Sequence, residues 1–183
     1  METAVTLPGR RVCLRAWRDE DRDPFAAMNA DARVMEFFRS LLSRTESDAF
    51  VDRIQKHFAE HHFGLWAIEV VGVAPFIGFA GLANASFRSR FTPCVEVGWR
   101  LAFEYWGYGY ATEAAKLAIH YGFDEHAFSE IVSYTSTANL RSRAVMERLG
   151  MHRDPADDFD YPGLPPEHPL SKHVLYRLRR EQA

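Results

Sequence analysis

Apolar residues change their spacing along the chain, and each change predicts a new element. Alternation of Val12, Leu14 and Ala16 with polar neighbours predicts a first strand. The acidic residues 19–21 then supply N-cap candidates for a helical stretch that contains Phe25, Met28, Val34, Met35 and Phe38. A second helix is predicted to start at residues 45–48, which read Thr-x-x-Asp in the manner of a capping box, and to end near Gly64.

The rest of the chain combines short strands with two further helices. Residues 65–71, 76–82 and 94–101 are rich in Val, Ile, Phe and Trp and are separated by Gly, Pro or Asn, which indicates an antiparallel meander. Helical spacing returns near Thr112, with a face of small residues that suits close packing on a sheet: Ala111, Ala114, Ala115, Ala118 and Gly122. The last predicted elements are a strand over 130–136, a helix over 140–149 before Gly150, a Pro- and Asp-rich loop over 154–169 and a strand over 174–178. This order predicts one mixed α/β domain over residues 1–183, around a mostly antiparallel sheet.

Composition narrows the class of protein. The 183 residues are 47% apolar and 26% charged, values typical of a folded globular chain and unlike a disordered one. Lys and Arg total 22 against 25 Asp and Glu, so the chain lacks the positive field expected of a nucleic-acid-binding protein. The N-terminus has no signal-peptide pattern, no run is long enough to span a membrane, and Cys13 and Cys94 are expected as buried thiols in a reducing compartment. These features predict a cytoplasmic protein.

Residues 94–112 carry the clearest chemical signal. A strand is predicted to end near Leu101, and the pair Gly107-x-Gly109 precedes the next helix. Glycines there let the backbone approach a ligand, and the amides of residues 107–111 would converge at the positive end of the helix dipole. The pattern indicates a phosphate or pyrophosphate site, although a turn can use glycine for structural reasons alone. A Walker P-loop is excluded because Tyr110-Ala111 follows the second glycine, and a Rossmann fingerprint is excluded because the third glycine and the parallel unit are missing.

Three sequence blocks, in matching order and spacing, resemble the GNAT superfamily of N-acetyltransferases. The resemblance is strongest to the branch of the ribosomal-protein-alanine N-acetyltransferases (RimJ/RimL-like). The blocks are residues 95–101 (VEVGWRL), residues 105–114 (YWGYGYATEA), and a C-terminal set of Thr135, Asn139, Ser142 and residues 146–151 (MERLGM). The chain departs from the family pattern at Glu104, where Gln or Arg is usual. The flanking elements also fit, so the resemblance extends over nearly the whole chain.

The resemblance implies acetyl-CoA as co-substrate. Its pyrophosphate would lie on the amides of the glycine turn, and its pantetheine arm would lie where the fourth and fifth strands of the family's sheet splay apart. The residues implied in cofactor binding, mainly through their backbone, are Val97, Trp99, Arg100, Leu101, Trp106, Gly107, Tyr108, Gly109, Tyr110, Ala111, Thr112 and Asn139. A backbone N–H near residues 97–99 would polarise the thioester carbonyl.

Acetyl transfer to an amine makes two chemical demands. The amine must lose a proton before it attacks, because a free α-amino group has a pKa of about 8, and Glu96 is the candidate base. The departing thiolate gains from an acid, and the resemblance points to Ser142, with Tyr134 as the alternative. Glu96 and Ser142 also fit structural roles, as a paired strand carboxylate and as a helix-start residue.

Several alternatives stay open at this point. The acceptor can be a protein N-terminus or a small-molecule amine, and a homodimer is compatible with the sequence. Partners in nucleic acid or membrane are not expected. A non-catalytic acyl-CoA-binding or sensing domain is the alternative function.

Two histidine-containing groups are further candidates. No metal is expected, because His57, His61 and His62 offer an i, i+4 pair without a third ligand at a predictable spacing. The acidic loop 157–161, with His168 and His173, is either a solvated loop or a lid over the acceptor. Phe37, Phe38 and Trp66 could line the acceptor side, although core packing is the more common use of such residues.

Overall fold

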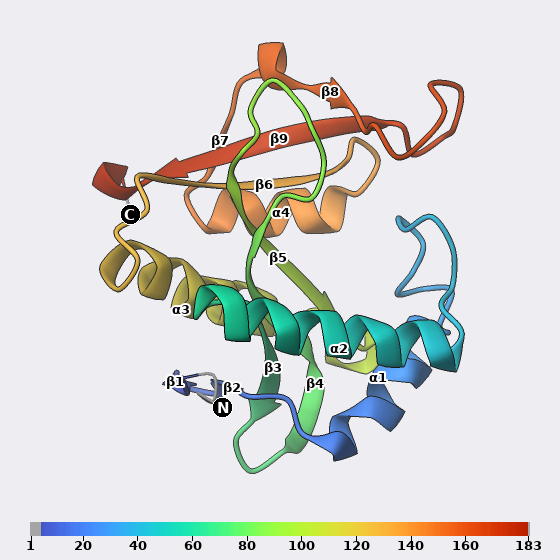
Figure 1. The fold of residues 1–183 in the computed structure, drawn as a ribbon, viewed down its shortest axis with the longest axis vertical. Helices are drawn as coiled ribbons and strands as arrows, with labels where there is room; N and C mark the ends of the chain where they lie inside the picture. Colours follow the sequence, from blue (N-terminus) through green and yellow to red (C-terminus); the bar gives the residue numbers. More distant parts are fainter. Residues whose placement is uncertain (1–4, 183) are drawn as a thin grey trace.

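The computed structural model describes residues 5–182 and is built around one mixed sheet of nine strands (Figure 1). The strand order is β1-β2-β3-β4-β5-β6-β9-β7, with β8 paired to β9. The strands are β1 (Leu7–Pro8), β2 (Val12–Arg15), β3 (Leu65–Val70), β4 (Ala74–Asn84), β5 (Val95–Leu101), β6 (Glu130–Ser136), β7 (His152–Arg153), β8 (Phe159–Asp160) and β9 (Lys172–Arg179). The α-helices are α1 (Arg22–Asn29), α2 (Arg44–His61), α3 (Tyr110–Asp124) and α4 (Leu140–Arg148). All paired strands are antiparallel except β5 and β6, which confirms the predicted fold class.

Opposite faces of the sheet are covered by different helices. Phe79 of β4 packs against Phe25 of α1 and Phe50 of α2, with ring centroids 6.0 and 5.8 Å away. Leu82, three residues on and therefore on the other face of β4, lies against α3, where a Cβ on Gly122 would be 2.7 Å from its Cδ1 atom. Side chains that alternate along β5 are thereby divided between an α1/α2 face and an α3 face.

The parallel pair β5–β6 is short, and the two strands part beyond it. Among residues 5–182, the one register pair between them is Glu96 opposite Val132. The Ser133 hydroxyl then donates to the Val97 carbonyl at 2.9 Å. Past this point Figure 1 shows β5 turning away from β6. The splay between the fourth and fifth long strands, implied by the resemblance, is therefore present.

Two predicted boundaries near the N-terminus are wrong. The first helix ends at Asn29, and residues 30–43 are irregular although Val34 and Met35 are buried. The Asp31 carboxylate accepts the backbone N–H and the guanidinium of Arg33, a local bond that competes with helix continuation. The second helix is capped at Ser43 in a reciprocal box with Glu46, two residues before the predicted start.

Other boundaries agree within a few residues. The strand Glu130–Ser136 matches the prediction, and α4 ends one residue early, before Gly150 at a φ of 77°. Helix α3 begins at Tyr110 instead of Thr112. The two-residue strands β1, β7 and β8 were not predicted. No helix within the described residues has the length and apolar character needed to cross a membrane.

Candidate active site

The predicted glycine turn lies directly at the start of α3. Gly107 and Gly109 both adopt a φ of 82°, which L side chains rarely take, and Gly109 is the N-cap of the helix. A Cβ added to Gly107 would meet no atom within 4 Å. The turn is therefore open on its outer side. The N–H groups of the first turn of α3, which have no partner within the helix, lie at this end of the helix. Ala111 and Thr112, both candidate cofactor residues, lie in that first turn.

The side chain of Arg11, from the segment just before β2, contacts the glycine turn, and the sequence analysis missed it. Its Nη2 would be 3.5 Å from a Cβ on Gly109, and its guanidinium stands 5.0 Å from the centre of the Tyr110 ring. Glu113 holds this cation at 2.8 Å and also accepts the Arg11 backbone N–H, and despite its partial burial these bonds lower the pKa of Glu113. Arg11 also donates to the Tyr108 carbonyl at 2.9 Å. A side chain 98 residues before Gly109 gives no local sequence signal of its position there.

Aromatic residues are frequent between the end of β5 and the start of α3. The Trp106 indole donates to the Leu101 carbonyl at 2.8 Å, and the guanidinium of Arg141 lies 4.8 Å from its ring centre. This contact joins the segment before α3 to α4. A surface pocket of about 360 Å³ lies beside it, lined by Ala32, Arg33, Glu36, Phe103, Trp106 and Arg141. Tyr108 is exposed and stacked against Tyr110 at 5.7 Å, so both rings stay near the turn.

Asn139 and Ser142 form one hydrogen-bonded group at the start of α4. Asn139 caps the helix by accepting the Ser142 backbone N–H at 3.2 Å. Its amide group donates to the Thr135 hydroxyl at 2.9 Å and to the Ser142 hydroxyl at 3.1 Å. Because Asn139 is the cap, the hydroxyl of Ser142 has no capping role of its own.

Glu96 and Tyr134 form a second polar group, at the last point where β5 and β6 are paired. The Tyr134 hydroxyl donates to the Glu96 carboxylate, which lowers the pKa of that acid, but burial outweighs the bond and raises the pKa to about 7. Burial also raises the pKa of Tyr134, with a smaller contribution from the Glu96 charge. A carboxyl group with a pKa near neutrality can accept and return a proton at physiological pH.

A cluster of rings surrounds Tyr134, and we call it the aromatic cluster. It comprises Phe87, Phe91, Tyr134, Phe159, Tyr161 and His173. Phe87 and Phe91 come from the segment between β4 and β5, which rises beside β8 in Figure 1. Tyr161 stacks on His173 at 4.9 Å, and burial lowers the pKa of that imidazole. The hydrogen bond from Tyr134 joins the cluster to Glu96.

The predicted residues of β5 are divided between the two faces. Val97 and Leu101 are buried and, with the partly buried Trp99, lie on the α3 face by strand alternation. Glu96, Gly98 and Arg100 lie on the α1/α2 face, where the Arg100 guanidinium is 5.6 Å from the ring of Phe50 in α2. The side chain of Arg100 therefore points away from the glycine turn, which leaves cofactor contact to its backbone.

The other residues singled out in the sequence, which are the histidines, Trp66 and the loop acids, are held by contacts of their own. His57 Nδ1 is 2.8 Å from the Phe63 carbonyl and its Nε2 accepts the Asn84 N–H, and no cluster of three or more metal-ligating side chains is present in residues 5–182. Trp66 is fully buried in the core. The loop acids are engaged in ion pairs, Asp157 with Arg177, Asp158 with Arg153 and Asp160 with Lys172. Phe159, Tyr161 and His173 of the proposed lid come near Glu96 through their ring contacts with Tyr134.

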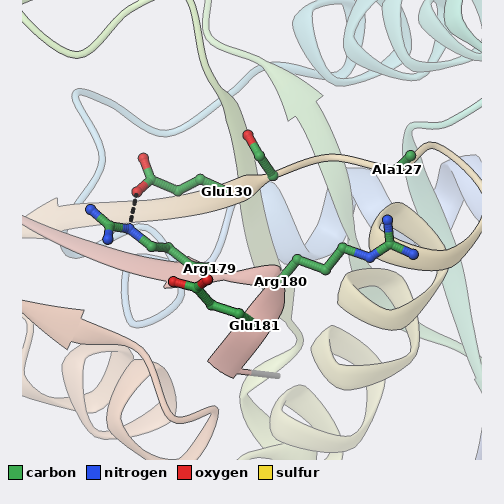
Figure 2. A pocket seen from close by; sticks show the side chains of 6 residues that line it. Ala127, Glu130, Arg179, Arg180 and Glu181 are labelled. Atoms are coloured by element: carbon green, nitrogen blue, oxygen red, sulfur yellow. Dashed lines mark ion pairs between the residues drawn. The ribbon is translucent and has the colours of Figure 1, made fainter.

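A surface pocket at the far end of β6 is separate from these residues. It is lined by Ala127, Ser129, Glu130, Arg179, Arg180 and Glu181. Figure 2 shows the ion pair between Glu130 and Arg179, 3.6 Å apart, with Arg180 directed away from it. The pocket lies where β6 begins, whereas the strands part toward its other end.

Comparison with known proteins agrees with this geometry. The family model described as "Acetyltransferase (GNAT) domain" matches residues 11–152. The uncharacterized protein YkkB of Bacillus subtilis is 28% identical over 153 residues, 83% of this chain and 88% of that protein. An FsC-acetyl coenzyme A-N(2)-transacetylase of Aspergillus fumigatus is 34% identical over 129 residues, 66% of this chain and 52% of that protein.

Solved structures give the same result for the fold. An acetyltransferase (GNAT family) from Bacillus anthracis superposes with a TM-score of 0.78 at 21% identity, over 97% of this chain and 99% of that one. A ribosomal-protein-S5-alanine acetyltransferase from Vibrio fischeri superposes with a TM-score of 0.75 at 17% identity, over 97% of both chains. Because the family model matches most of this chain, residues 11–152, the chain belongs to the GNAT family of acetyltransferases.

Proposed function

We propose that this acetyl-CoA-dependent N-acetyltransferase acetylates a primary amine that binds on the α1/α2 face of β5, with Glu96 as the base. The observation that carries the proposal is the position of Glu96, a half-buried carboxyl group where β5 and β6 part that is hydrogen-bonded to Tyr134. Its pKa of about 7 means that a large fraction is ionised at neutral pH and can take a proton from an ammonium group.

The chain's own residues suit the cofactor. The amides of residues 107–111 would present the positive end of the helix dipole, and the Arg11 guanidinium, in its ion pair with Glu113, lies beside them, which fits a pyrophosphate. The backbone of Val97, Trp99 and Leu101 borders the gap between β5 and β6, where an extended pantetheine arm can add to the strand. Bound there, acetyl-CoA supplies the activated acyl group.

Glu96 and Ser142, which lie toward opposite faces of the sheet, would divide the proton transfers. Glu96, with Tyr134 on its face, would receive the proton of the attacking amine. Ser142, grouped with Thr135 on the other face, would donate to the departing thiolate. Tyr134 would act as a positioning residue, because its hydroxyl is already committed to Glu96.

A thiol-release assay with acetyl-CoA and a panel of primary amines tests the proposal. The panel should contain alkylamines, amino acids and short peptides with free N-termini, and mass spectrometry should identify the acetylated product. We expect one class to be acetylated with saturation kinetics. Binding of acetyl-CoA without turnover of any amine would favour the sensing domain instead.

A further inference from the structure

Arg100 is a buried cation with few polar partners. The residue is 8% exposed, and the rings of Phe38, Phe79 and Phe50 lie 3.9, 5.5 and 5.6 Å from its guanidinium carbon. Its Nη1 donates to the Asn29 side-chain oxygen at 2.7 Å, and Asn29 donates in turn to the Ser47 hydroxyl. Burial lowers the pKa of the guanidinium to about 10, which leaves it charged at neutral pH.

The protein provides this cation with no counter-charge among the described residues. The only hydrogen bond from its guanidinium there is the one to Asn29, and Nε is buried without an acceptor. By contrast, Arg15, which is also buried, has the carboxylates of Asp21 and Glu69. A buried charge without a partner is costly, so a structural role alone does not account for a guanidinium at this position.

The two nitrogens left over, Nε and Nη2, lie on the same edge of the guanidinium plane. This edge is the fork that binds a carboxylate through two parallel hydrogen bonds. Phe38, which is 40% exposed and belongs to the irregular segment 30–43, lies 3.9 Å from the guanidinium carbon and is the exposed member of the three rings around it.

Arg100 shares its strand face with Glu96. The two residues are four apart on β5, so their Cα atoms are separated by about 13 Å. Gly98 lies between them, and a Cβ added to it would meet no atom within 4 Å. The face therefore has a negative group at one end, open space in the middle and an unpaired cation at the other end.

We propose that the acceptor is an amino carboxylate, with its amine at Glu96 and its carboxylate on the free edge of Arg100. This inference rests on the proposed function, since it names the substrate class of the same site. A carboxylate is preferred over a phosphate because, within residues 5–182, Arg100 is the one buried cation among these three rings, and one charge balances one charge.

A series of ω-amino acids and matched n-alkylamines, from two to eight carbons, tests the inference. We expect kcat/KM for the best amino acid to exceed that for the alkylamine of equal length by about 10-fold or more. The chain length of the best amino acid should report the spacing between the Glu96 carboxyl group and the Arg100 guanidinium. In Arg100→Met the ratio should fall to near 1, whereas Arg148→Met, which removes an exposed guanidinium on α4, should keep it. Arg100→Lys, which keeps the charge but loses the fork, should give an intermediate ratio.

The outcomes separate the inference from the proposed function. Equal rates for amino acids and alkylamines would overturn the inference and leave amine acetylation intact. If no amine is acetylated, the proposed function fails, and calorimetry with hexanoate still decides the role of Arg100. Binding of hexanoate to the wild type that is lost in Arg100→Met and kept in Arg148→Met supports the site, and equal or absent binding overturns it. Where Arg100→Met does not fold, Arg100→Lys provides the same comparison.

Discussion

The Tyr134 hydroxyl donates a hydrogen bond to the Glu96 carboxylate across the last paired position of β5 and β6. Burial raises the pKa of Glu96, and the bond from Tyr134 partly offsets that rise, so that the carboxyl group titrates at about 7. A base whose pKa lies near the working pH combines a large ionised fraction with useful basicity. The pair thus sets the proton chemistry of the proposed site.

Replacing Tyr134 with Phe should raise the pKa of Glu96 further, because the hydrogen bond that lowers it is lost. The acidic limb of the kcat/KM profile should then move to higher pH, while the rate on the plateau changes little. If Tyr134 is instead the acid that protonates the thiolate, kcat should fall at every pH without a shift of the limb. A pH–rate profile of Tyr134→Phe distinguishes the two.

Ser142→Ala should lower kcat by about 10-fold or more, with little change in KM for acetyl-CoA, because a donor to the leaving thiolate acts in the transition state. The melting temperature should change little, since Asn139 and not Ser142 caps α4. Ser40→Ala, at an exposed serine, serves as the control. An unchanged kcat in Ser142→Ala would assign the thiolate's proton to Tyr134 or to solvent.

Gly109→Glu should abolish acetyl-CoA binding, because it adds bulk and negative charge at the proposed pyrophosphate site. Gly72→Glu is the matched control: Gly72 has a φ of 73°, close to the 82° of Gly109, and a Cβ there meets nothing within 4 Å. Both variants carry the same backbone strain, but only Gly109→Glu should lose binding in calorimetry. Equal affinity in the two variants would remove the glycine turn from the cofactor site.

Glu96→Gln should stabilise the fold at neutral and alkaline pH. The folded-state pKa of about 7 lies above the ordinary value of 4.5 for a glutamate. The destabilisation of the native state therefore increases as pH rises from about 4.5 to 7 and is constant above that. At one pKa unit per 1.36 kcal/mol, the penalty amounts to at most about 3 kcal/mol. Urea unfolding of both proteins should give similar stabilities at pH 4 and a more stable variant at pH 8. A variant that is less stable at pH 8 would show that the carboxylate is structurally required.

The sequence predicted the parts of the site that are local in the chain. A strand over 94–101 was predicted, and its alternation puts Glu96 and Val97 on opposite faces, while the Gly107-x-Gly109 spacing marked the turn before α3. Asn139 and Ser142 are three residues apart and meet within one helical turn. In each case the geometry follows from the period of the element or from the φ that glycine permits.

Relationships between distant segments could not be read in this way. Arg11 reaches the glycine turn through Glu113, and the aromatic cluster joins the segment before β5 to the end of the chain. The stretch through Phe38 was predicted to be helical because its apolar spacing fits a helix, yet the helix ends at Asn29, next to the local Asp31–Arg33 bonds. Arg100 was assigned to the cofactor, mainly through its backbone, and the motif does not record which helix covers the side chain on its face of β5.

The pH dependence of kcat/KM in wild type and Glu96→Gln tests the central claim most directly. The account predicts that the wild-type rate rises with pH through an apparent pKa of about 7, because the ionised carboxylate is the active form. Glu96→Gln should lose this limb and fall by roughly 100-fold, with partial recovery at high pH, where the free amine needs no base. If Glu96→Gln stays within about threefold of wild type from about pH 6 to 9, the base lies elsewhere, and His173 and Asp160 are the next residues to replace.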